Sequence, residues 1–214
     1  MDTPVRITEI FYSLQGESTR VGLPTVFVRL TGCPLRCVYC DSAYAFTGGE
    51  KWSIRDILDE VAKHQTRFVC VTGGEPLAQK SCLLLLAVLC DAGFDVSMET
   101  SGALDITPVD PRVSRIMDIK TPASGEVLRN RYENIADLRP LDEVKFVISN
   151  REDYLWSVDC LQRYALSERC PVLFSTTFSQ LEPHELAEWV LEDHLPVRFQ
   201  LQMHKLLWGE AQGR

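Results

Sequence analysis

Apolar residues recur along this chain with two different spacings, one typical of strands and one typical of helices. Short runs rich in Val, Ile and Phe have the length and composition of buried strands. In contrast, Ile54, Ile57 and Val61 recur every three or four positions and share one face of a helix. Because the two patterns alternate, they predict βαβ units and a mainly parallel sheet. The predicted strands are 6–14, 25–30, 68–72, 95–99, 114–119, 143–148, 172–176 and 197–201, and the predicted helices are 53–64, 81–92, 153–166 and 183–194.

The number of strands decides between the architectures that such units can build. After an N-terminal pair of strands, the pattern predicts about six parallel strands and fewer helices. A closed TIM barrel needs eight strand–helix units. The sequence therefore predicts a partial, open TIM-like barrel of about six parallel strands with a reduced helix set, with a doubly wound sheet as the other architecture. No repeat or linker divides the chain, so residues 1–214 are expected to form a single domain.

Composition and charge narrow the class of partner. The 214 residues carry a formal net charge of −8 and no basic stripe, which argues against direct binding of nucleic acid. The longest apolar run, 82–90, is too short to span a bilayer. The N-terminus carries no secretory signal, so a cytoplasmic protein without a membrane partner is expected. A small molecule or another protein is the predicted partner.

Polar loops directly follow four of the predicted strands, at 32–41, 72–76, 99–102 and 120–122. In parallel α/β folds, the carboxyl ends of the strands lie together and carry the active site. We therefore expect these four loops to meet at one site.

Eight cysteines are distributed unevenly, and Cys33, Cys37 and Cys40 lie within eight residues of one another. Structural zinc takes four ligands, usually as two pairs, and no second Cys/His pair follows at a suitable spacing. A [4Fe–4S] cube held by three cysteines instead leaves one iron free to bind another ligand. The spacing favours such a cluster, with zinc as the alternative. The other five cysteines lie among apolar residues and are predicted to be core residues: Cys70, Cys82, Cys90, Cys160 and Cys170.

The cysteine spacing, Cys-x3-Cys-x2-Cys with Tyr39 before the last cysteine, resembles the radical S-adenosylmethionine (SAM) superfamily. A second superfamily element is the Gly-Gly-Glu-Pro turn at 73–76. The resemblance implies that the open iron binds SAM and that an electron from the cluster cleaves it to a 5′-deoxyadenosyl radical. The cofactor-binding residues it implies are Tyr39, Cys40 and Asp41 beside the adenine, Gly74 and Glu75 at the methionine end, and Glu99, Thr100, Asp118, Ile119 and Lys120 around the rest of the pocket.

Two further motifs, Leu-Gln-Gly-Glu at 14–17 and Gln-x-His-Lys at 202–205, resemble the 7-carboxy-7-deazaguanine synthase family. The resemblance runs from about residue 6 to residue 208. It implies a radical SAM carbon–nitrogen lyase that contracts the ring of 6-carboxy-5,6,7,8-tetrahydropterin to 7-carboxy-7-deazaguanine. Ammonia is lost, and the product lies on the route to queuosine and other deazapurines. The family also implies Mg²⁺, a homodimer and a flavodoxin-like electron donor.

The same resemblance implies a set of substrate-binding residues. Glu17 would pair with the guanidine-like edge of the pterin, and Arg29 would bind its carboxylate. Ser42 stands where the family commonly has the Thr that helps to bind Mg²⁺, and Ser18 replaces the usual Gly. Beyond the cluster and SAM, no catalytic residue is implied. The remaining implied substrate contacts are Leu14, Gln15 and Gly16, mainly through their backbone, with Thr72 and His204.

Two other functions share part of this sequence pattern. A glycyl-radical-enzyme activating enzyme has the same cluster, but it would leave the motifs at 14–17 and 202–205 unexplained. A non-enzymatic iron–sulfur or zinc module would not need the Gly-Gly-Glu-Pro turn. Iron and sulfide content distinguishes zinc from a cluster, and cleavage of SAM distinguishes an electron carrier from an enzyme.

Overall fold

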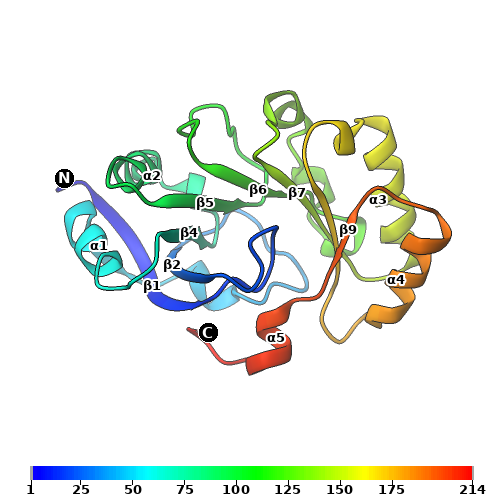
Figure 1. Ribbon diagram of the computed structural model, residues 1–214, viewed down its shortest axis with the longest axis horizontal. Coiled ribbons are helices and arrows are strands. Elements are labelled where there is room, and N and C mark those ends of the chain that lie inside the picture. Colours follow the sequence, from blue (N-terminus) through cyan, green and yellow to red (C-terminus); the bar gives the residue numbers. More distant parts are fainter. Residues whose placement is uncertain (1, 214) are drawn as a thin grey trace.

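A computed structural model describes residues 2–213, and within them nine strands form one curved sheet in the order β3-β1-β2-β4-β5-β6-β7-β8-β9 (Figure 1). The strands are β1 (Pro4–Leu14), β2 (Pro24–Leu30), β3 (Glu50–Ser53), β4 (Phe68–Gly73), β5 (Asp95–Thr100), β6 (Ser114–Asp118), β7 (Glu143–Ile148), β8 (Val172–Thr176) and β9 (Arg198–Gln200). The α-helices are α1 (Ile54–Val61), α2 (Ser81–Asp91), α3 (Arg151–Arg163), α4 (Pro183–Glu192) and α5 (Met203–Trp208).

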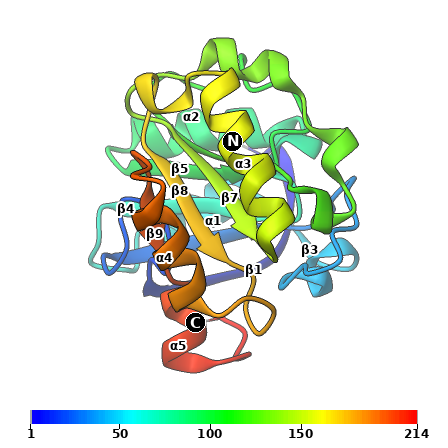
Figure 2. The same ribbon diagram turned by 90° about the vertical axis from the view of Figure 1, so that its right-hand side faces the viewer.

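The sheet is parallel from β2 through β4 to β9, whereas β1 runs antiparallel between β2 and β3. The two edge strands, β3 and β9, are not paired with each other, so the sheet does not close. Helices α1 and α2 cover the first half of the outer face, and α3 and α4 cover β7 and β8 (Figures 1 and 2). The predicted partial, open barrel is confirmed, and the doubly wound alternative is wrong because these helices share one face.

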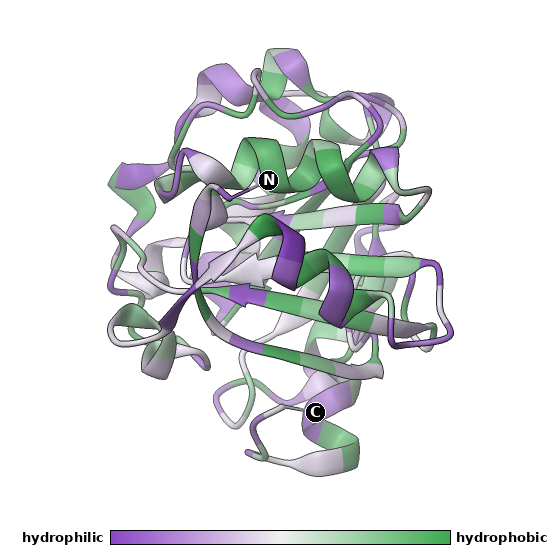
Figure 3. Cartoon of the chain, turned by 90° about the vertical axis from the view of Figure 1, so that its left-hand side faces the viewer, coloured by the Kyte–Doolittle hydropathy of each residue, from purple (hydrophilic) through white to green (hydrophobic). Residues whose placement is uncertain are grey.

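Alternate residues of each strand build the core under these helices. Val26 and Val28 of β2, for example, pack with Ile57 of α1 and Leu86 of α2. Helix α2 is apolar nearly all round, whereas α1 alternates apolar and polar residues (Figure 3). Helix α1 begins where the sequence predicts, because the Ser53 side chain accepts a hydrogen bond from the backbone N–H of Asp56.

Two elements are absent from the sequence-based prediction. Strand β3 is an edge strand of four residues, and its first two, Glu50 and Lys51, are exposed. It therefore has no alternating apolar pattern that the sequence could reveal. Helix α5 has six residues, fewer than periodicity can identify. Four of the five cysteines predicted in the core are buried, but Cys90 of α2 is only partly buried. Among residues 2–213, no helix has the length and hydropathy needed to cross a bilayer.

The loop between β1 and β2, residues 15–23 and hereafter the hairpin loop, fills the inside of the open barrel from the amino-terminal ends of the strands. Its residues 15–18 are buried. Gln200 of β9 bonds both backbone groups of Ser18, with its Oε1 2.9 Å from the Ser18 nitrogen. Arg20 forms an ion pair of 2.6 Å with Asp95 at the start of β5. The hairpin loop therefore ties together strands that the open sheet leaves unpaired.

Candidate active site

A cavity of about 460 Å³ opens at the carboxyl ends of the parallel strands, as the four polar loops predict. Its wall combines the loop that carries the three cysteines (residues 33–40, the cysteine loop), the hairpin loop and the segment around α5. Every residue predicted from the sequence lines this cavity except Glu75 and Ile119. These residues are Leu14, Gln15, Gly16, Glu17, Arg29, Cys33, Cys37, Tyr39, Cys40, Asp41, Ser42, Thr72, Gly74, Glu99, Thr100, Asp118, Lys120 and His204.

The three thiols of the cysteine loop are partly buried, free of disulfide bonds and face the cavity. Burial raises the pKa of Cys37 to about 11 and also raises that of Cys33. Among residues 2–213, no three His, Cys, Asp or Glu side chains are arranged so that they could hold one metal ion together. The fit to a [4Fe–4S] cluster therefore rests on the donor chemistry, since three thiolates on one loop are what such a cube needs to keep one iron open.

The Gly-Gly-Glu-Pro turn packs directly on the backbone that leads into the cysteine loop. The Glu75 N–H donates to the Gly32 carbonyl at 2.7 Å, and the Gly74 N–H donates to Leu30 at 3.1 Å. A Cβ atom at residue 74 would lie 2.1 Å from the Gly32 carbonyl oxygen, so only glycine permits this approach. The turn and the cysteine loop are thereby held as one unit on the cavity wall.

Glu75 itself does not line the cavity and is fully buried. Its carboxylate accepts hydrogen bonds from the Thr100 hydroxyl at 2.9 Å, from the Ser101 backbone at 2.7 Å and from the Leu77 backbone at 3.0 Å. Its side chain thus joins the turn to the end of β5. The predicted contact of Glu75 with the methionine end of SAM stays a prediction. Because the Glu75 side chain is occupied within the protein, the backbone of Glu75 would have to make that contact.

Ile119 is also buried away from the cavity, in the core beneath α3. Its neighbours Asp118 and Lys120 do line the cavity, and their side chains form an ion pair of 2.9 Å. Because successive residues of an extended segment face opposite sides, the side chain between two inward-facing residues must face outward. The Ile119 side chain therefore does not reach the predicted SAM pocket.

Arg29 of β2 lies on the cavity wall, with its side chain 17% exposed. Its Nε donates to Glu9 at 2.7 Å, and its guanidinium lies over the rings of Phe11 and Tyr44. Burial opposes the charge, but Tyr44 and Glu9 raise the pKa of Arg29, so the guanidinium stays charged. This position suits the predicted binding of a substrate carboxylate, which stays a prediction.

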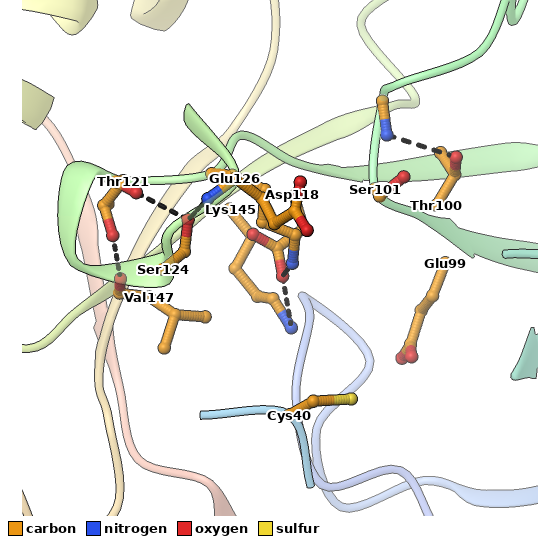
Figure 4. A network of polar contacts seen from close by, with 12 residues as sticks. Cys40, Glu99, Thr100, Ser101, Asp118, Thr121, Ser124, Glu126, Lys145 and Val147 are labelled. Carbon is orange, nitrogen blue, oxygen red and sulfur yellow. Dashed lines mark hydrogen bonds and ion pairs between the residues drawn. The ribbon is translucent and has the colours of Figure 1, made fainter. Parts of the chain in front are cut away.

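Charged side chains from three neighbouring strands line one part of the cavity. Glu99 of β5, Asp118 of β6 and Lys145 of β7 lie around one space, and Cys40 approaches it from the cysteine loop (Figure 4). Lys145 Nζ is 2.5 Å from Glu17 of the hairpin loop and 3.7 Å from Asp118. Thr72 donates to Glu99 at 2.8 Å. The interior of the barrel is therefore ionic, in contrast to its apolar outer face.

The outer rim of the cavity carries the other predicted residues. Tyr39 reaches the Val147 carbonyl at 3.5 Å, and burial raises its pKa to about 12. The Ser42 hydroxyl lies 3.8 Å from the Cys40 sulfur, and His204 lies 3.9 Å from Asp41. The segment that directly follows the cysteine loop therefore approaches α5 at the cavity wall.

His204 also lies against Gly16, where a Cβ atom would come 2.3 Å from the imidazole Nδ1. We expect Gly16→Ala to lower the free energy of unfolding by about 1–3 kcal/mol, as overpacking does. In a His204→Ala background the loss should become smaller, because the clashing ring is gone. Urea unfolding of both single variants and the double variant measures the interaction. Strictly additive losses would contradict the contact.

Several lining residues were not assigned from the sequence. Lys145 lies inside the Val-Lys-Phe-Val-Ile motif at 144–148, and a lone charge in an apolar strand was the clue to its role. Gln202 belongs to the Gln-x-His-Lys motif, and its Nε2 donates to Glu17 at 2.8 Å. The loop after β8 had no recognisable motif. It contributes Thr177, Phe178 and Gln180.

Comparisons with known proteins identify the family and the fold that this chain resembles. Residues 27–119 match the family model of the radical SAM superfamily. A 7-carboxy-7-deazaguanine synthase from Chlorobaculum tepidum is 44% identical and covers 99% of this chain and 98% of its own length. The enzyme of the same name from Koribacter versatilis is also 44% identical, over 95% of this chain and 97% of its own length. The crystal structure of QueE from Escherichia coli superimposes with a TM-score of 0.73 at 22% identity, covering 94% of this chain and 95% of that one.

Proposed function

Since the chain belongs to the 7-carboxy-7-deazaguanine synthase family of the radical SAM superfamily, we propose that it contracts the ring of 6-carboxy-5,6,7,8-tetrahydropterin to 7-carboxy-7-deazaguanine with loss of ammonia. The observation that carries the proposal is the meeting of two distant motifs, at 14–17 and 202–205, in the same cavity as the cysteine loop. A cavity of about 460 Å³ suits a small molecule. An activating enzyme would need an extended groove for a protein substrate, and it would leave both motifs unexplained.

The family implies a [4Fe–4S] cluster and SAM, and Cys33, Cys37 and Cys40 are the residues that would hold the cluster. When bound, the two groups supply the one-electron chemistry that removes a hydrogen atom from the substrate and returns it. The residues of the chain form the wall of the cavity that would enclose these groups. Gly74 and the rest of the Gly-Gly-Glu-Pro turn would offer backbone acceptors to an ammonium group, and the cysteine loop keeps the thiols in reach of the cavity.

The substrate would lie between the hairpin loop and β2. Glu17 offers carboxylate oxygens to the amino-bearing edge of the pterin, and Arg29 offers a guanidinium to its carboxylate. One charged group for each end of the molecule fixes its orientation. Enclosure by the hairpin loop and α5 keeps water away from the reacting ring carbon.

The fuller proposal includes Mg²⁺ near Ser42, a flavodoxin-like electron donor, a homodimer, a cytoplasmic location and one domain. Its test is anaerobic reconstitution with iron and sulfide, followed by dithionite, SAM, Mg²⁺ and 6-carboxytetrahydropterin. Mass spectrometry should find the deazaguanine carboxylate in excess over the SAM consumed. Formation of 5′-deoxyadenosine and methionine alone would contradict the substrate and favour the activating enzyme.

A substitution of Ser42 tests whether this residue binds Mg²⁺. We expect Ser42→Ala to reduce the stimulation of turnover by Mg²⁺, because the variant loses the one hydroxyl proposed to bind the ion, which takes its remaining ligands from water and substrate. Ser42→Thr, which restores the family's usual residue, should keep the stimulation or increase it. The measurement is initial rate against Mg²⁺ concentration. Equal curves for all three proteins would exclude Ser42 as a ligand.

A further inference from the structure

Glu17 is held by two side chains from parts of the chain that are far from it in sequence. Its Oε1 accepts from Gln202 Nε2 at 2.8 Å, and its Oε2 accepts from Lys145 Nζ at 2.5 Å. Gln202 lies between β9 and α5, and Lys145 lies in the middle of β7. Both donors are fixed by the fold, so the carboxylate has one orientation toward the cavity that it lines.

This arrangement leaves the carboxylate with a defined pair of free acceptor positions. Each carboxylate oxygen has two lone pairs, and one on each oxygen of Glu17 is used by the protein. The two lone pairs that remain, one on each oxygen, can accept hydrogen bonds from two parallel N–H groups, such as those of a guanidine-like group. A ring edge that carries an oxo group in place of the amino group presents only one donor.

The charged groups around Glu17 favour its ionised form. Burial alone would raise its pKa, but Lys145 of β7 and His204 of α5 lower the pKa to about 2. Lys145 in turn faces Asp118 of β6 and Glu99 of β5 as well as Glu17, and these carboxylates raise its pKa although burial opposes them. Hydrogen bonds to an ionised acceptor are about twice as strong as those between neutral groups.

We propose that Lys145 and Gln202 are positioning residues that make Glu17 bind selectively to the amino-bearing edge of the pyrimidine ring. The inference rests on the proposed function and deepens it, because it states what the site reads in its substrate. Neither residue needs to touch the substrate. They act through the orientation and charge of Glu17.

The test compares two ligands on the cluster-loaded enzyme with SAM. One is 6-carboxytetrahydropterin, and the other is its counterpart with a 2-oxo group in place of the 2-amino group. Anaerobic calorimetry measures both affinities. We expect the native enzyme to prefer the amino compound by about 10- to 100-fold, the value of one charge-assisted hydrogen bond. Lys145→Met should lower that preference to about threefold or less, and Lys145→Arg should keep most of it.

The pH profile distinguishes positioning from general support of the fold. In Lys145→Met, burial is no longer opposed by the lysine, so the pKa of Glu17 rises and binding of the amino compound weakens as the pH falls toward 5.5. The native enzyme should lack this additional loss of affinity between pH 8 and pH 5.5. Lys63→Met, which removes an exposed lysine that forms an ion pair with Glu60, is the matched control and should resemble the native enzyme.

Two results would overturn the inference. The first is a native preference in Lys145→Met at every pH, because any loss of affinity would then be equal for both ligands, which is the mark of a structural role. If Lys145→Met does not fold, Gln202→Met takes its place, and an unchanged preference there overturns the inference equally. Failure of the native enzyme to bind either compound would instead remove the proposed function, and the inference with it.

Discussion

Replacing Cys37 by alanine is expected to abolish both the brown absorbance of the iron–sulfur cluster and product formation. A [4Fe–4S] cube that keeps one iron open needs three thiolates, and the cysteine loop supplies only three. Removal of one leaves two irons without protein ligands. Iron and sulfide content after anaerobic reconstitution, with the visible spectrum, measures the loss.

Cys90→Ala is the matched control for this prediction. Cys90 is also partly buried, but it lies on α2 and does not line the cavity. The control should keep the full complement of iron and the native rate. A full complement of iron in Cys37→Ala would overturn the assignment of the loop. Zinc in the native protein would favour the alternative metal instead.

The second large effect is expected at Asp142, which lies just before β7 and is fully buried. Its carboxylate accepts from both side chain and backbone of Arg115 and of Arg139, with an Oδ2 to Arg115 Nη2 distance of 2.6 Å. Asp142→Ala leaves the buried guanidinium of Arg115 without its counter-ion. Breaking a buried pair in this way costs about 3–5 kcal/mol, a large part of the stability of an ordinary domain.

Urea unfolding measures this loss against Asp159→Ala, which removes an exposed partner of Arg163 on α3 and should change stability by less than about 0.5 kcal/mol.

The pH dependence gives a second test. Although burial opposes them, Arg115 and Arg139 lower the pKa of Asp142 in the folded protein below its unfolded value. The pair therefore stabilises the fold above the unfolded pKa of about 3.9, and this contribution is lost as the pH falls through the folded pKa. Asp142→Asn should lack that acid-dependent step.

The parallel strands could be predicted closely because each combines a short apolar run with turn residues at both ends. Strand β7 has the bounds that the sequence predicts, 143–148. Helix α3 begins at Arg151, two residues before the predicted start, because the Asn150 side chain caps it by accepting from the Asp153 N–H. Short edge strands and helices of fewer than two turns carry too few residues for either period to be recognised, which explains why β3 and α5 were missed.

The site residues could be predicted wherever polar residues directly follow a strand. The prediction was poorer where the direction of a side chain decides whether the residue lines the cavity. Strand alternation alone separates Asp118 and Lys120 from Ile119, so that correction was available in the sequence. The same alternation turns Lys145 inward. The position of Glu75 was not available, since it depends on donors from Thr100 and Ser101, which only the tertiary structure brings to it.

The bond between Ser18 and Gln200 also has a consequence for the order in which the protein is built. These two residues are 182 positions apart, so this bond cannot form until nearly the whole chain has left the ribosome, whereas the ion pair of Arg20 with Asp95 can form earlier. The backbone bonds that join the Gly-Gly-Glu-Pro turn to the start of the cysteine loop, in contrast, link Leu30 and Gly32 to Gly74 and Glu75, which are all synthesised early. A nascent chain can therefore join these two segments well before it can complete the contacts of Gln200 with the hairpin loop. Closing so long a loop costs conformational entropy, so the contacts of Gln200 and Gln202 with the hairpin loop are among the last that the growing chain can form.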